Sequence, residues 1–162
     1  MLAKVRFDVG ATADIMSPGE HSASLRHVLG DMERERVRGR KHMRFQMSAV
    51  PSGGAVTIGT GTQPVGPDAG YAWSISRLTA SGLTASATTP DELNIYFNNA
   101  TGVAEWQLTG NNWAYTFGKC ELTMYGGDIL IAASTGSFAA TGTIIVRGEA
   151  RQVPQEMLGE FL

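Results

Sequence analysis

Three histidines and one cysteine are the residues best suited to metal or nucleophilic chemistry, and their spacing favours neither. His21 and His27 are six residues apart, which does not place two metal ligands on one face of a helix. Cys120 is far in sequence from every histidine, whereas a cysteine nucleophile needs a neighbouring base. We therefore expect Cys120 to be a small buried apolar residue, and we expect no catalytic residue, no metal and no cofactor.

A glycine-rich stretch, "GTGTQPVG" at 59–66, has the composition of a phosphate-binding loop. It lacks the Gly-Lys-Ser/Thr ending of such loops, and two prolines at 64 and 67 leave no helix to follow it. The stretch is predicted to be a surface loop without a nucleotide.

Three tryptophans could form a platform on which a sugar stacks. Trp73 and Trp113 fall on the same alternating faces as Ile75 and Phe117, so they are predicted to face the core of a sheet protein. Trp106 does not share one clean alternation with its neighbours. It is therefore the candidate for an exposed, ligand-stacking aromatic.

Positive charge is concentrated in "MERERVRGRKHMRF", residues 32–45, which holds six of the 13 Lys and Arg of the chain. Glu33 and Glu35 lie between the arginines, and no DNA-binding or RNA-binding motif surrounds them. Specific nucleic-acid recognition is therefore not expected, although contact with packaged DNA stays open as an alternative. The mixed signs favour docking on a protein partner. The charged residues expected to dock are Arg34, Arg38, Arg40 and Lys41.

The conformation of residues 34–42 is left open by the sequence. A helix would put Arg34, Arg38 and Lys41 on one face, whereas a strand would point Met43, Phe45, Met47 and Ala49 one way and His42, Arg44 and Gln46 the other. We expect a helix to end near Gly39 and a strand to begin near Lys41.

A helix is predicted from about residue 18 to the mid-thirties. Ser17 can cap it, Pro18 suits its first position, and Glu20 completes a capping box. Apolar residues then recur at helical spacing and form one stripe. That stripe needs a partner to cover it, and it consists of Leu25, Val28, Leu29 and Met32.

The rest of the chain alternates in short strands separated by glycine-rich turns, after a first short strand at 4–9. Roughly eight or nine strands with no helix between them predict an antiparallel β-sandwich, and eight strands fit a jelly roll best. The charged residues divide the chain in the same way. Residues 1–50 carry nine basic and six acidic residues, whereas residues 51–162 carry four basic and nine acidic residues. We therefore expect an N-terminal helical anchor segment over 1–50 and a jelly-roll domain over 51–162.

Within residues 66–158, four stretches occur in a recognisable order: "GPDAGYAWSISRLTASGL", "DELNIYFNNATG", "WAYTFGKCELTMYGGDILIA" and "FAATGTIIVRGEARQVPQEML". In this order the chain resembles small virion-associated proteins of tailed bacteriophages, notably those that infect actinobacteria. The resemblance implies a jelly-roll module attached to a head, neck or tail. It implies no catalytic residue.

The expected function is that of a non-enzymatic accessory structural protein of a phage virion. Its partners would be other virion proteins and further copies of itself, and it would be assembled in the host cytoplasm. No run of about 18 apolar residues is present, so no membrane partner is expected. The alternatives are a carbohydrate-binding or receptor-binding module of a fibre or tail tip and, third, a hydrolytic fibre domain.

Overall fold

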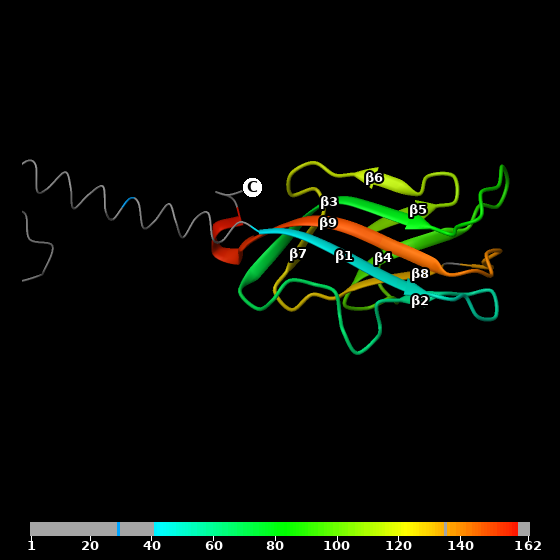
Figure 1. Cartoon of the computed structure of the whole chain (residues 1–162), viewed down its shortest axis with the longest axis horizontal. Coiled ribbons are helices and arrows are strands. Elements are labelled where there is room, and N and C mark those ends of the chain that lie inside the picture. Colours follow the sequence, from blue (N-terminus) through cyan, green and yellow to red (C-terminus); the bar gives the residue numbers. More distant parts are fainter. Residues whose placement is uncertain (1–28, 30–40, 135, 159–162) are drawn as a thin grey trace, which may run out of the picture. The chain divides into compact units, whose positions relative to one another are not determined.

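The computed structural model describes Leu29, residues 41–134 and residues 136–158. The chain divides after Gly39, and the unit considered below is Arg40–Leu162. Figure 1 draws the described residues in colour.

The predicted strand at 4–9 and the predicted helix from residue 18 lie outside the described residues, apart from Leu29. The side chain of Leu29 is 61% exposed. The unit begins earlier than the boundary that the sequence indicates after residue 50. The reason is that a strand starting at Lys41 pairs with the last strand of the chain.

Nine strands form two antiparallel sheets within the described residues, so the predicted mainly β class is confirmed. A strand also begins at Lys41, where the sequence predicts one. The elements are β1 (Lys41–Ala49), β2 (Thr57–Ile58), β3 (Tyr71–Ser81), β4 (Glu92–Phe97), β5 (Trp106–Thr109), β6 (Ala114–Thr116), β7 (Thr123–Tyr125), β8 (Leu130–Ser134), β9 (Ile144–Pro154) and the 3-10 helix η1 (Gln155–Met157).

The first sheet has the order β1-β9-β3-β6, and β7 also pairs with β3. β6 and β7 lie end to end along β3, because β6 pairs with its second half and β7 with its first. The second sheet has the order β2-β8-β4-β5. Figure 1 shows β3, β9 and β1 running side by side across the unit.

One hydrophobic core lies between the two sheets, as expected for a β-sandwich. Alternate residues of each strand supply it, because successive side chains of a strand point to opposite faces. The largest fully buried apolar side chains come from seven of the strands: Ile58, Ile75, Leu78, Leu93, Ile95, Leu108, Met124, Leu130, Ile144, Val146 and Val153.

Two predictions about single residues are wrong. Trp113 was expected to share the buried face of Phe117, but it is 54% exposed. It precedes the three-residue strand β6, so the alternation of that strand does not extend to it. Cys120 was expected to be buried, but it is exposed. It lies with a φ of 58° in the turn before β7, rather than in the strand itself.

Candidate functional site

Most of the residues expected to dock on a partner lie outside the described part of the chain: Leu25, Val28, Met32, Arg34, Arg38 and Arg40. Leu29 and Lys41 are described, and both are exposed. Lys41 begins β1 opposite Gln152 of β9.

Trp106, the candidate for ligand stacking, begins β5 in the second sheet and is half-buried. Its ring centroid lies 4.4 Å from that of Tyr115 and 5.0 Å from that of Phe117. These rings are part of the packing at the edge of the core. Trp106 therefore contributes to the sandwich, and the most exposed tryptophan is Trp113.

All four arginines of the described chain lie on the outer face of the first sheet, a grouping that the sequence analysis missed. The face is centred on Glu149 of β9. Arg44 of β1 is paired with Glu149 on one side, and Arg77 of β3 is paired with it on the other. Arg147 and Arg151 lie two residues before and after it on β9, about 7 Å away along the strand. We call these five residues the arginine face; four positive charges and one negative charge give it a net charge of +3.

A β-bulge in β3 points Arg77 outward. The register of β3 against β9 shifts between Ile75 and Arg77, so Ser76 is an extra residue. Ile75 and Leu78 are both fully buried, although strict alternation would put them on opposite faces. The bulge thus keeps Leu78 in the core and turns Arg77 to the outer face, the kind of re-aiming for which bulges are known.

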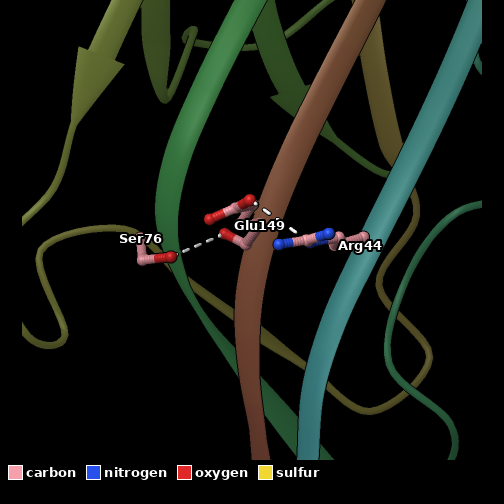
Figure 2. Close-up of polar contacts among 3 residues, drawn as sticks. All are labelled: Arg44, Ser76 and Glu149. Atoms are coloured by element: carbon pink, nitrogen blue, oxygen red, sulfur yellow. Dashed lines mark hydrogen bonds and ion pairs between the residues drawn. The ribbon is translucent and has the colours of Figure 1, made fainter.

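Two polar contacts join the three strands of this face (Figure 2). Arg44 reaches across from β1, and its Nε lies 3.3 Å from Oε1 of Glu149. On the other side, the Ser76 hydroxyl donates a hydrogen bond of 3.1 Å to the backbone carbonyl of Glu149. The Arg44 side chain is 80% exposed and that of Glu149 36%. An ion pair this accessible to water adds little to stability, so the arginines are not explained by the stability of the fold.

The arginine face borders a groove of about 550 Å³. Arg147 Nε donates to Gln46 Oε1 at 2.8 Å, which orients both side chains. Within the described residues, Arg77 and Arg151 have no ion-pair partner. Groups that donate hydrogen bonds predominate around the groove, and Glu149 supplies its only carboxylate. The polar side chains that line it are Arg44, Gln46, Arg77, Thr79, Arg147 and Glu149.

A second carboxylate, Asp91, is buried at one end of the sandwich and has a structural role. It accepts hydrogen bonds from the backbone N–H groups of Thr84 (2.8 Å), Ala139 (2.6 Å) and Ala140 (3.1 Å). Burial alone would raise the pKa of Asp91, but these bonds outweigh it and hold the pKa below the ordinary value of 3.8. Asp91 therefore stays ionised and joins two loops, and with an exposure of only 1% it is not accessible to a substrate.

Among the described residues, no group of three or more His, Cys, Asp or Glu side chains is arranged to hold a metal ion. The same part of the chain contains no helix that is long and apolar enough to cross a bilayer. No family model matches the chain, and no curated protein matches it significantly. The role of the arginine face is therefore inferred from its geometry and charge.

Proposed function

We propose that the chain is a non-enzymatic accessory structural protein of a bacteriophage virion, built on a jelly roll and attached through its N-terminal segment. Its partners are other virion proteins of the head, neck or tail and further copies of itself. It is assembled into the particle in the host cytoplasm.

The observation that carries this proposal is the order in which the strands pair. Among the described strands, the first pairs with the last (β1–β9), the second with the one before it (β2–β8), β3 with β6 and β7, and β4 with β5. Wrapping this ribbon brings β9 beside β3 and β8 beside β4. With β6 and β7 counted as one interrupted strand, the order is that of an eight-stranded jelly roll, a fold of viral capsid and lectin domains.

The N-terminal segment supports attachment. The apolar stripe that its sequence predicts is too narrow to form a core by itself, so a helix carrying it would gain stability by packing on a partner or on another copy. The adjoining arginines and glutamates supply both charge signs, which fix orientation on a neighbour more than they add affinity.

The proposal is tested by the full-length double variant Leu25→Asp/Leu29→Asp in the phage that encodes the chain. Burying two unpaired carboxylates is costly, so the variant should be lost from purified particles, as measured by quantitative mass spectrometry. Val103→Asp is the matched control, because Val103 is 91% exposed on a loop of the sandwich and its change should leave incorporation intact. Incorporation of the double variant at the wild-type level would contradict attachment through this stripe.

A carbohydrate-binding module is the second candidate function, and the groove beside the arginine face favours it. Jelly rolls occur in lectins as well as capsids, and a groove of about 550 Å³ has the size of a ligand site. The two functions are compatible, because the residues proposed for attachment end at Lys41, whereas those that line the groove begin at Arg44.

A further inference from the structure

The geometry points to the arginine face as a binding site for an acidic carbohydrate, that is, a glycan whose rings carry carboxylate groups beside free hydroxyls. This inference does not depend on attachment to a virion. It assigns the ligand site to the outer face of β1, β9 and β3, on the opposite side of that sheet from the core to which Trp106 belongs.

The charge of the face requires an anionic ligand. Arg77 and Arg151 have no ion-pair partner in the described chain, and the guanidinium of Arg147 is bonded only through Nε to a neutral amide. A guanidinium presents five N–H donors in a plane that matches the two oxygens of a carboxylate. Two anionic groups can be held at once, because Arg147 and Arg151 point to the same face about 13 Å apart along β9.

Glu149 indicates that the ligand also donates hydrogen bonds. It lies at the centre of the face, and Arg44 contacts only its Oε1. A carboxylate here would repel a polymer that offers nothing but anionic oxygens, whereas a sugar hydroxyl can donate to Oε2. The Thr79 hydroxyl and the Gln46 amide, which also line the groove, are suited to ring hydroxyls.

A nucleic acid is a poorer fit for the same face. Single-stranded nucleic acids are held by cations together with aromatic side chains on which the bases stack. Phe45 is the one aromatic residue that lines the groove, but its ring is already stacked on Trp73. The exposed Trp113 is not among the lining residues and precedes β6 at the sheet edge. Glu149 would also lie against the phosphates.

The direct test is titration calorimetry of the full-length protein at physiological salt with four probes. Oligogalacturonate carries both carboxylates and hydroxyls, polyglutamate carries carboxylates and peptide groups but no hydroxyls, dextran carries hydroxyls without charge, and single-stranded DNA carries phosphodiesters and bases. We expect saturable binding of oligogalacturonate at least tenfold tighter than that of the other three. Equal binding of polyglutamate would overturn the inference in favour of an acidic protein partner, and tighter binding of DNA would overturn it in favour of nucleic acid. Absence of oligogalacturonate binding would also overturn it.

Variants then locate the site. Arg77→Gln and Arg147→Gln should each weaken oligogalacturonate binding at least tenfold without lowering the melting temperature, since both side chains are exposed. Lys119→Gln is the matched control, because it removes an exposed positive charge that does not line the groove. Glu149→Ala should abolish the preference for oligogalacturonate over polyglutamate, because it removes the acceptor for hydroxyls. An unchanged preference in Glu149→Ala, or equal losses in Arg77→Gln and Lys119→Gln, would overturn the assignment.

Discussion

Phe45 of β1 lies directly opposite Gly148 of β9, and its ring fills the space that a side chain at Gly148 would occupy. The same ring stacks on Trp73 of β3, with centroids 5.7 Å apart and planes 15° from parallel. Trp73 in turn donates from Nε1 to Oε1 of Gln152 at 2.8 Å within the buried layer. A single missing Cβ on the central strand therefore lets three strands pack closely beneath the arginine face.

Gly148→Ala should destabilise the protein, because the new methyl group overlaps the ring of Phe45 and forces it off Trp73. Overpacking of this kind typically costs about 1–3 kcal/mol. Urea denaturation followed by tryptophan fluorescence measures the effect. Gly142→Ala is the control, because nothing lies within 4 Å of a Cβ at Gly142. Equal stability of the two variants would contradict the packing described here.

Asp91→Asn should lower the free energy of unfolding at pH 7 by about 2 kcal/mol, because hydrogen bonds to a charged acceptor are lost. The pKa of Asp91 is lower in the folded protein than the ordinary value of 3.8, so the unfolded chain binds its proton more readily. The stabilisation from Asp91 is therefore fully present above about pH 4–5 and is lost as the pH falls through the folded pKa.

The difference in stability between wild type and Asp91→Asn should thus shrink as the solution is acidified below about pH 4. Thermal melting between pH 7 and pH 3 gives the measurement. Asp68→Asn serves as the control, since Asp68 is exposed. If the difference in melting temperature between wild type and Asp91→Asn stayed constant over this pH range, the ionised form of Asp91 could not be the cause of that difference.

Deletion of Ser76 should be tolerated better than a deletion inside a regular strand. Because Ser76 is the extra residue of the bulge, a β3 without it alternates regularly, so Ile75 and Leu78 stay in the core and Arg77 stays on the outer face. We expect a cost of about 1 kcal/mol, mainly from the lost hydrogen bond to the Glu149 carbonyl, measured by urea denaturation.

Deletion of Asn94 in β4 is the contrasting variant, because it turns the fully buried Ile95 to the other face and should cost about 2 kcal/mol or more. A Ser76 deletion as damaging as the Asn94 deletion would contradict the assignment of Ser76 as the extra residue.

The tryptophans should differ in their access to solvent. Acrylamide should quench Trp113 efficiently and Trp73 hardly at all, because Trp113 is 54% exposed and Trp73 only 4%. Trp113→Phe should therefore remove most of the quenching.

Trp106→Ala should lower the melting temperature, because the contacts with Tyr115 and Phe117 are lost. A stable Trp106→Ala variant that loses glycan binding would instead assign the ligand to Trp106.

The basic stretch can be tested by changing Arg34, Arg38, Arg40 and Lys41 to Gln together. If this stretch docks on protein, the wild-type chain should bind duplex DNA only in the non-specific range of about 10⁻⁴ to 10⁻⁶ M, and the variant should lose attachment to particles. Filter binding at several salt concentrations provides the measurement. Tight DNA binding with a steep salt dependence that the variant loses, while it still joins particles, would identify DNA as the partner.

Strand positions could be predicted wherever alternation was regular. The strand from Lys41 onward and the buried residues Leu93 and Ile95 follow directly from a period of two. The same rule failed at Trp113, which precedes the short strand β6. The burial of Cys120 was predicted from its residue type, and it failed because Cys120 lies in the turn before β7.

The arginine face could be predicted only in part. The alternation of Arg147, Glu149 and Arg151 was visible in the last strand, and so was the outward position of Arg44. Arg77 could not be added, because period-two counting from Ile75 assigns it to the core and only the bulge at Ser76 reverses that. The pairing of β9 with both β1 and β3 is a long-range choice, which local sequence patterns do not specify.

The pairing of the first described strand with the last also has a mechanical consequence. β1 is the strand through which the N-terminal segment joins the sandwich, and all nine of its residues are in register with β9. Tension applied at Lys41 along the axis of β1 loads these pairs in shear, so that they must break together. Tension applied across the axis would open them one after another from Lys41. A sandwich tethered at this point would therefore resist a steady pull along β1 much better than a sideways one.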